Sequence, residues 1–104
     1  MIIRLTNTLA RKIKEAGLPS MAPDPNPYAD WTARLFTADR TQYILISNTA
    51  SLYSVVMYGR GITDANALIH RMIDTLRDVT ERDGFRLLYE TQVAPQTTQI
   101  SFSK

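Results

Sequence analysis

His70 is the only histidine in the chain, and Asp74 follows it by four residues, which places both side chains on one face of a helix. A carboxylate at that spacing can orient an imidazole ring for acid–base chemistry or for binding a metal ion. A structural zinc site needs four ligands, however, and the chain has no cysteine and no second histidine. We therefore interpret the pair as the polar face of an amphipathic helix and predict no metal site and no cofactor.

A second stretch with chemical potential is "YGRGITD", residues 58–64, in which a predicted strand passes through two glycines into a helix. Backbone N–H groups at such a junction can bind an anion such as phosphate. The stretch lacks the third glycine of a dinucleotide-binding loop and the Lys-Ser/Thr end of a P-loop, and Asp64 would repel an anion. A sharp turn explains the glycines better, and Arg60 between them is the candidate anion-binding residue.

Serine and acidic residues offer no recognisable catalytic arrangement. None of Ser47, Ser51 and Ser54 lies in a Gly-x-Ser-x-Gly nucleophile elbow. The acidic residues are scattered over predicted turns and the outer face of a helix, where no apolar pocket is expected to raise a carboxyl pKa for acid–base work. The sequence therefore argues against an enzyme and identifies no catalytic residue.

Tyrosines and basic residues suggest a nucleic-acid surface as an alternative. Tyr43, Tyr53 and Tyr58, with Arg34 and Arg40, fall in or beside predicted strands, and unpaired bases stack on aromatic rings exposed on a sheet. The one basic cluster without acidic neighbours lies in the first 14 residues: Arg4, Arg11, Lys12 and Lys14. Tyrosine is also an ordinary strand residue, and the net charge is only +2. Nucleic-acid binding by this cluster with Tyr43 and Tyr53 is therefore the alternative function.

The elements that must position these residues begin with the densest apolar run, "TQYILISNTASLYSVVMYG", residues 41–59. Its central "SNTAS" is small and polar, as in a tight connection, so we predict a β-hairpin that turns at residues 48–50. The flanking "QYILIS" and "LYSVVMY" are rich in β-branched and aromatic residues without clean alternation, which is typical of inner strands covered on both faces. The segment "WTARLFTA", residues 31–38, alternates as a half-buried strand does.

Two helices are predicted. The longer has Thr63 as its N-cap, carries an apolar residue every three or four positions through Val79, and ends at Asp83 and Gly84. The shorter, residues 7–16, follows an opening strand "MIIRLT" and ends at Gly17.

The remaining segments are shorter or ambiguous. Four of the five prolines fall in "LPSMAPDPNPY", residues 18–28, which predicts a surface loop. Residues 85–94 fit a strand or a helix, and we favour a helix. In "TQISFS" the apolar Ile100 and Phe102 alternate with serines, so we predict a last strand, placed beside the opening one.

Composition limits the class of protein. A chain of 104 residues is the size of one domain, and 44% hydrophobic with 21% charged residues is ordinary for a globular protein. No run of about 18 apolar residues and no signal peptide stands out, so we expect a cytoplasmic protein without a membrane segment. The absence of cysteine excludes disulfides and thiolate catalysis.

Three blocks of the sequence resemble, in order and spacing, a family of small bacterial proteins classed as a domain of unknown function. They are the opening "MIIRLTNTLARKI", the block "DWTARLFTADRTQYILISNTASLYSVVMYG" and the end "YETQVAPQTTQISFSK". Where the family often has histidine and asparagine after the tryptophan, this chain has Thr32 and Arg34. The resemblance implies a fold and a bacterial origin, and it implies no activity.

Together these patterns predict an α+β fold. We expect residues 1–104 to form a single layered domain, with an antiparallel or mixed sheet of about five strands and two main helices on one face. The function we favour is a non-catalytic interaction or accessory module of a bacterial cytoplasmic system that binds a protein partner or itself. A small enzyme centred on Arg60 or His70 is the third hypothesis. The sequence leaves the partner, the ligand, the oligomeric state and the strand order open.

Overall fold

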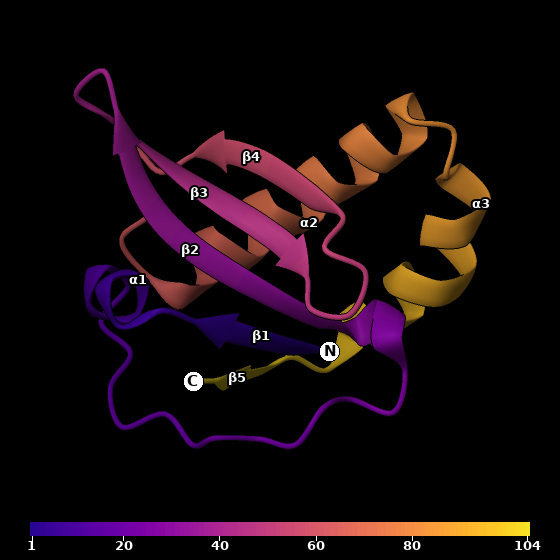
Figure 1. The fold of residues 1–104 in the computed structure, drawn as a ribbon, viewed down its shortest axis with the longest axis horizontal. Coiled ribbons are helices and arrows are strands. Elements are labelled where there is room, and N and C mark those ends of the chain that lie inside the picture. Colours follow the sequence, from indigo (N-terminus) through magenta and orange to yellow (C-terminus); the bar gives the residue numbers. More distant parts are fainter.

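The computed structural model describes residues 1–104, in which five strands form one mixed sheet in the order β4-β3-β2-β1-β5 (Figure 1). The strands are β1 (Ile2–Leu5), β2 (Asp30–Ala38), β3 (Thr41–Asn48), β4 (Ser54–Tyr58) and β5 (Ser101–Ser103). β2, β3 and β4 pair antiparallel, whereas β1 is parallel to both β2 and β5. The predicted α+β fold with a mixed sheet is confirmed.

Two main helices lie on one face of the sheet, as predicted. They are α1 (Asn7–Lys12) and α2 (Ala65–Arg82), and both bury apolar side chains in the same core as the sheet. α1 ends before the predicted residue 16, because Lys14 has a left-handed backbone with a φ of 62°. The N-cap of α2 is Asp64 rather than the predicted Thr63, since the Asp64 carboxylate accepts a hydrogen bond from the Ala67 N–H at 2.8 Å.

Residues 86–98 are helical throughout, although their geometry changes along the way. Helix α3 (Arg86–Leu88) is followed by a π-helical turn, Tyr89–Val93, and by a 3₁₀ segment, Ala94–Thr98. A further 3₁₀ turn, Pro27–Ala29, precedes β2. The helical interpretation of residues 85–94 is thus confirmed in the main.

The hairpin predicted from "SNTAS" joins β3 to β4. The Asn48 N–H donates to the Tyr53 carbonyl at 2.8 Å, and the Asn48 side chain accepts from the Ser51 N–H at 3.0 Å. The connection is longer than predicted and includes Leu52, which has a positive φ of 64°. The prediction that β3 and β4 are covered on both faces is wrong. The helices cover one face only, and Val56 is 51% and Tyr58 63% exposed on the other.

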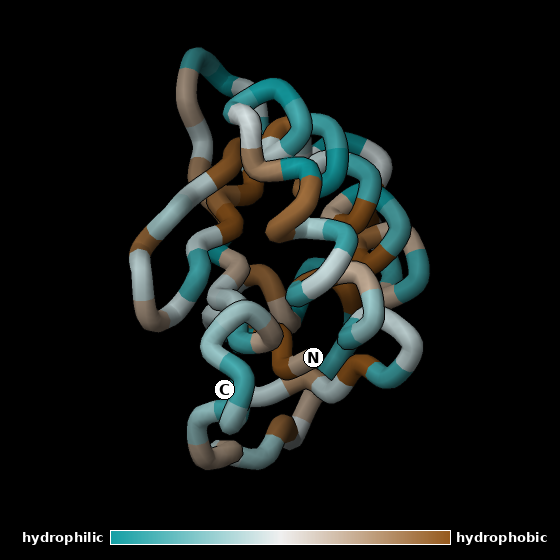
Figure 2. The backbone as a smooth tube through the Cα atoms, turned by 90° about the vertical axis from the view of Figure 1, so that its right-hand side faces the viewer, coloured by the Kyte–Doolittle hydropathy of each residue, from teal (hydrophilic) through white to brown (hydrophobic).

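The core lies between the sheet and the two helices. Strand residues such as Ile3, Ile44 and Ile46 meet Leu68 and Met72 of α2 there, all of them nearly inaccessible to solvent. Figure 2 shows the corresponding hydrophobic segments inside the molecule and hydrophilic ones over much of its outside. The last strand is where it was predicted, since Phe102 pairs with Ile3 of β1.

Candidate interaction site

The face of the sheet opposite the helices is uncovered over β2, β3 and β4. Strand register places its side chains in rows that run across the sheet, and one row joins Phe36, Tyr43 and Tyr58. The three rings stack in series, with centroid distances of 5.5 Å and 5.4 Å. The next row is Arg34, Leu45 and Val56. These two rows form a mainly apolar patch, which soluble proteins usually avoid over contiguous areas, whereas the third row, Thr32, Ser47 and Ser54, is polar.

The orientation of the rings limits what this row can bind. The planes of neighbouring rings differ by only 22° and 28°, so Tyr43 has an aromatic neighbour on both of its faces. A nucleic-acid base stacks on a free ring face. Phe36 and Tyr58 each keep one face without a neighbour in the row, so two bases at most can stack against it.

β4 forms one edge of the sheet. The hydrogen bonds from the Asn48 N–H to the Tyr53 carbonyl and from the Gly59 N–H to the Gln42 carbonyl, each 2.8 Å, fix which backbone groups face β3. In an antiparallel ladder hydrogen-bonded residues alternate with outward-facing ones. Val55 and Met57 therefore bond to β3, while the backbone groups of Ser54, Val56 and Tyr58 point outward. The Arg71 side chain bonds one of them, the Tyr58 carbonyl, at 3.3 Å.

The two edges of this sheet are protected differently. The β5 edge lies beneath the proline-rich segment of residues 18–27, where the Lys104 N–H donates to the Pro19 carbonyl at 2.9 Å and the Met21 N–H to the Ser103 hydroxyl at 3.0 Å. β4 has the sequence "SVVMY", with no charge and no proline. Proteins commonly use charges, prolines or covering segments to keep edge strands from pairing with other chains. The β4 edge has none of these devices.

A shallow groove runs between the β4 edge and α2. It is lined by Val56, Met57, Tyr58, Arg71, Thr75, Asp78, Val79 and Arg82. At one end the Arg71 guanidinium donates to the carbonyls of Tyr58 and Arg60, and in the middle the Thr75 hydroxyl lies 3.7 Å from the Met57 sulfur. β4 and α2 therefore run antiparallel along the groove. Its helical wall carries two arginines and one aspartate.

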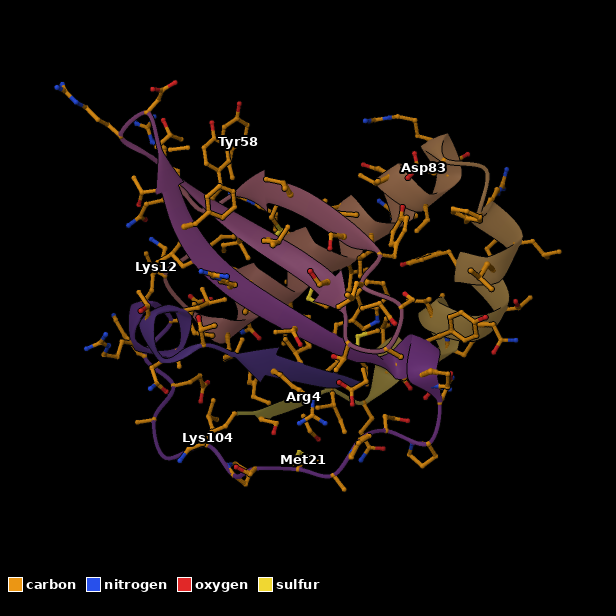
Figure 3. The ribbon with its side chains drawn as sticks, viewed as in Figure 1. Arg4, Lys12, Met21, Tyr58, Asp83 and Lys104 are labelled. Atoms are coloured by element: carbon orange, nitrogen blue, oxygen red, sulfur yellow. The ribbon has the colours of Figure 1, made fainter.

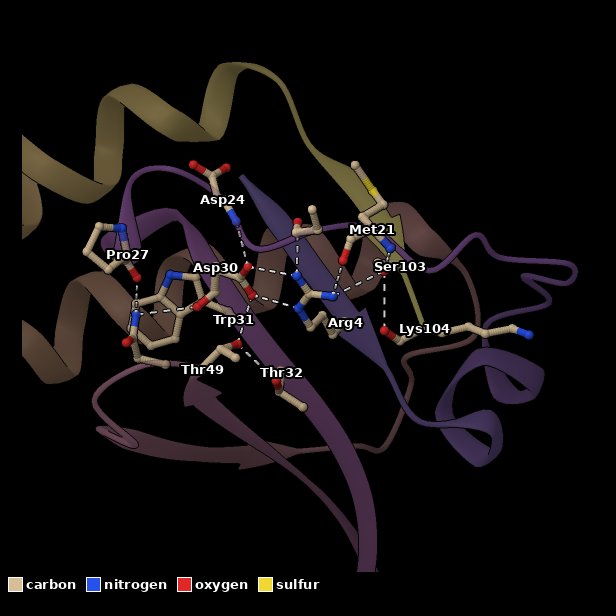
Figure 4. A network of polar contacts seen from close by, with 12 residues as sticks. Arg4, Met21, Asp24, Pro27, Asp30, Trp31, Thr32, Thr49, Ser103 and Lys104 are labelled. Carbon is tan, nitrogen blue, oxygen red and sulfur yellow. Dashed lines mark hydrogen bonds and ion pairs between the residues drawn. The ribbon is translucent and has the colours of Figure 1, made fainter.

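Arg4, the first residue of the predicted basic cluster, is engaged inside the molecule (Figure 4). Its Nε and Nη2 atoms each lie 2.9 Å from an Asp30 carboxylate oxygen, and Nη1 donates to the Met21 carbonyl at 2.9 Å. The hydrogen bonds from Arg4 are the main cause that lowers the pKa of Asp30 to about 2. Arg4 therefore joins β1 and β2 to the proline-rich segment and has few donors left for a ligand.

The other predicted nucleic-acid residues are not brought together. Arg11 and Lys14 are exposed at α1, and Lys12 donates to the Gln42 side chain at 2.8 Å. Tyr43 lies on the uncovered face, whereas Tyr53 lies on the helix side of the sheet and donates its hydroxyl to Asp83 at 2.8 Å. Figure 3 shows Lys12 near one corner of the sheet and Asp83 near the opposite one.

The remaining candidates are exposed and separate. Arg60 lies in the turn before α2, where its backbone carbonyl accepts from Arg71 at 2.7 Å. His70 is exposed on α2, and Asp74 pairs with Arg77 at 3.2 Å. No three His, Cys, Asp or Glu side chains come close enough together to hold a metal ion. None of the helices combines the length and the hydrophobicity that crossing a membrane requires.

Sequence reasoning missed the edge position of β4 and its groove. One signal was present: Ser54, Val56 and Tyr58 alternate with Val55 and Met57 in the pattern of a strand with one buried face. The alternation was hard to recognise because valine occupies both a buried position, Val55, and an exposed one, Val56.

A mixed sheet with helices on one side, one covered edge and one bare edge defines a small α+β protein with an uncovered sheet face. The chain belongs to the family "Domain of unknown function (DUF6933)", whose profile matches residues 2–104. This confirms the resemblance found in the sequence. No curated protein and no solved structure matches the chain. The family name assigns no activity, so function has to be argued from the site.

Proposed function

We propose that this protein is a non-catalytic interaction module of the bacterial cytoplasm that binds an extended segment of a partner protein as a sixth strand along β4. The observation that carries the proposal is the bare β4 edge, where the backbone groups of Ser54 and Val56 and the N–H of Tyr58 point outward beside a groove. Strand addition of this kind takes its affinity from main-chain hydrogen bonds and its specificity from alternate side chains.

The surroundings of the edge define where the partner's side chains go. Side chains of an added strand alternate between the two faces of the sheet. On one side they extend the apolar rows that end in Val56 and Tyr58, and covering those two exposed side chains contributes favourable burial. On the other side they enter the groove against α2, between Thr75 and Val79.

Charge favours a foreign, acidic segment over a second copy of this chain. In a twofold pairing of two β4 strands about Val56, the Arg71 end of one groove would meet the Arg82 end of the other, because β4 and α2 run antiparallel. Like charges placed opposite each other weaken such an interface. A partner with Asp or Glu at both ends of its strand meets an arginine at each end instead.

Selection from a phage-displayed library of random 12-residue peptides tests the proposal. We expect enrichment of peptides that alternate β-branched residues and carry acidic residues near both ends, with micromolar affinity as fluorescein-labelled synthetic peptides. The double substitution of Arg71→Glu and Arg82→Glu should weaken binding at least tenfold. The double substitution of Arg11→Glu and Lys14→Glu, an equal charge change in and just after α1, is the control and should have no effect.

Backbone addition itself is tested with Val56→Lys, which places a charge on the edge strand. A selected peptide should no longer bind this variant. When the peptide binds the unsubstituted protein, it should shift the NMR amide resonances of Ser54, Val56 and Tyr58 more than those of Val55 and Met57. If selected peptides bind Val56→Lys as tightly as the unsubstituted protein, strand addition at β4 is wrong.

The stacked row of Phe36, Tyr43 and Tyr58 favours single-stranded nucleic acid as a second candidate. The rings lie on an open face beside the exposed Arg34, and aromatic stacking with nearby positive charge is the usual basis of sequence-tolerant binding. Fluorescence anisotropy with a labelled 12-nucleotide oligo(dT) at low salt tests it. Binding should weaken when Tyr58 is replaced by Ala or when Arg11, Lys12 and Lys14 are replaced by Glu. An oligonucleotide that does not bind at low salt removes this candidate.

A further inference from the structure

A second site lies away from the β4 edge, where the β3–β4 connection approaches the C-terminal end of α2 and the segment around α3 (Figure 1). It is a pocket of about 220 Å³. Its walls are mostly aromatic and aliphatic: Tyr28, Trp31, Asn48, Ser51, Tyr53, Thr80, Phe85, Leu88, Tyr89 and Val93. These residues come from four separate stretches of the chain, residues 28–31, 48–53, 80 and 85–93, so the pocket forms only in the folded protein.

Most polar side chains in the pocket wall are already hydrogen-bonded within the protein, and the exceptions are the hydroxyls of Tyr28 and Tyr89. Trp31 donates its indole N–H to the Tyr28 carbonyl at 2.8 Å, and Thr80 donates its hydroxyl to the carbonyl of Leu76, one turn earlier in α2. Tyr53 donates its hydroxyl to Asp83 at 2.8 Å.

The side chain of Asn48 is satisfied in the same way. Its amide N–H donates to the Pro27 carbonyl at 2.8 Å, and its oxygen accepts from Ser51. Since a buried polar ligand group without a partner costs free energy, a polar or charged ligand group that faces these bonded side chains finds no compensation.

The segment that closes the pocket has an uncommon backbone. Tyr89 and Val93, the two ends of the π-helical turn, are both buried and both line the pocket. π-Helical turns are rare and occur frequently at functional sites, because they displace side chains that a regular α-helix would place elsewhere. At the entrance Phe85 and Leu88 remain partly exposed although they are apolar. A ligand in the pocket removes part of that surface from water.

We infer that this pocket binds a small, neutral, apolar molecule with one or two fused rings. Size sets the upper limit: an apolar cavity of about 150 Å³ accommodates benzene, so a pocket of about 220 Å³ accommodates a larger, two-ring molecule. The chemistry of the wall indicates the class of ligand, because the surface that faces the pocket consists almost entirely of ring and aliphatic carbon. The site is distinct from the β4 groove and does not depend on the function proposed for that groove.

Trp31 makes the inference directly measurable, because it is the only tryptophan in the chain and lies in the pocket wall. Bromobenzene and 1-bromonaphthalene are neutral probes whose bromine quenches indole fluorescence on contact. We expect saturable quenching of Trp31 by both, with 1-bromonaphthalene binding at least tenfold more tightly. The anion 4-bromobenzoate should give no saturable quenching, because its carboxylate would lose its hydration against an almost entirely apolar pocket surface.

A matched pair of substitutions locates the binding. Leu88 lines the pocket and is 37% exposed, whereas Leu87, its neighbour in α3, is 72% exposed and does not line it. Leu88→Gln should lower the affinity for 1-bromonaphthalene at least fivefold, and Leu87→Gln should leave that affinity unchanged. Val93→Phe, which fills the pocket, should abolish saturation.

Two outcomes would overturn the inference. One is quenching that rises linearly with probe concentration, which indicates collisions only. The other is saturable quenching that Leu88→Gln leaves unchanged, which places the probe elsewhere. Leu88 is partly exposed, so Leu88→Gln should still fold. It therefore tests the inference even if Val93→Phe fails to fold.

Discussion

The pair of Arg4 and Asp30 connects more of the molecule than any other two side chains. The Asp30 carboxylate accepts from Arg4, from the Asp24 N–H at 3.0 Å and from the Thr49 hydroxyl at 2.8 Å. Only 17% of the Arg4 side chain and 5% of the Asp30 side chain are exposed. Two strands, the proline-rich segment and the β3–β4 connection therefore depend on one carboxylate staying ionised.

This dependence predicts how stability changes in acid. The pKa of Asp30 is about 2 in the folded protein, below its ordinary value of 3.8. Its ionised form stabilises the fold fully above the ordinary value, and the contribution of about 2 kcal/mol is lost as the pH falls from about 4 through 2. Urea unfolding at pH 6, 4 and 2 measures it. Asp30→Asn should be less stable than the unsubstituted protein at pH 6, and the difference should shrink towards pH 2. A difference that stays constant over this range contradicts the prediction.

Tyr53 gives the opposite dependence at high pH. Burial first, and the hydrogen bond to Asp83 second, raise its pKa to about 12. The neutral phenol is favoured in the folded state, so its stabilisation is complete below the ordinary value of 10 and is lost as the pH rises through 12. In a spectrophotometric titration Tyr53→Phe should remove a component near pH 12. Asp83→Asn should lower that component only in part, because burial remains. If Tyr53→Phe leaves the high-pH component intact, the assignment is wrong.

Among the elements, β5 is short, and it forms the edge of the sheet beside β1. It is parallel to β1, and Ile100 and Phe102 pack against the core. The Ser103 hydroxyl additionally bonds the Met21 N–H and the Pro19 carbonyl, each at 3.0 Å. β5 therefore covers the edge of β1 and also holds the proline-rich segment in place.

Removing residues 99–104 should lower the melting temperature by at least about 10 °C. Loss of two partly buried apolar side chains amounts to about 3 kcal/mol, and each kcal/mol corresponds to about 4–8 °C in a protein of this size. Differential scanning calorimetry measures the change. The control Lys104→Ala, which keeps the backbone hydrogen bond to Pro19, should have little effect. An unchanged melting temperature on removing residues 99–104 contradicts the role of β5.

The outward direction of the β4 edge groups can be tested by proline substitution. Val55 uses its N–H in the ladder with β3, whereas the N–H of Val56 points outward, so proline removes a hydrogen bond only at position 55. We expect Val55→Pro to cost about 3 kcal/mol or more, or to prevent folding, and Val56→Pro to cost much less. Equal losses measured by urea unfolding would show that both residues are inside the sheet.

At the scale of the whole molecule, an open apolar face and a bare edge coexist with a positive charge. The net charge is +2, and the groove beside β4 carries Arg71 and Arg82. Repulsion between these arginines therefore opposes self-pairing of β4. Salt screens such repulsion, because the Debye length falls from about 10 Å at 0.1 M to about 3 Å at 1 M.

Self-association should therefore increase with salt. We expect sedimentation equilibrium to show a monomer at 0.05 M NaCl and a growing dimer fraction at 1 M, driven by the apolar edge once repulsion is screened. Val56→Lys should stay monomeric in both conditions. Dimerisation that is independent of salt would contradict the charge argument and would make a second copy, rather than an acidic partner, the natural occupant of β4.

Local patterns in the sequence determined several elements of this protein. The apolar period of residues 65–82 predicted α2, the polar break "SNTAS" predicted the hairpin, and the alternation around Phe102 predicted a strand. Such patterns succeed because helical and strand periodicity and turn chemistry are properties of a few consecutive residues. The family resemblance and the α+β class also came from the sequence.

The tertiary structure alone decided which surfaces are free. A β-branched run such as residues 54–58 has the same composition in a covered strand as at an exposed edge, so only the strand order shows that β4 is an edge. Likewise, Tyr43 and Tyr53 both lie in predicted strands, and only the tertiary structure shows that Tyr43 is on the uncovered face whereas Tyr53 packs against the core and bonds Asp83. Arg4 meets Asp30 across 26 residues, and the pocket around Trp31 draws on distant segments. These features depend on pairing between distant parts of the chain, which local periodicity does not encode.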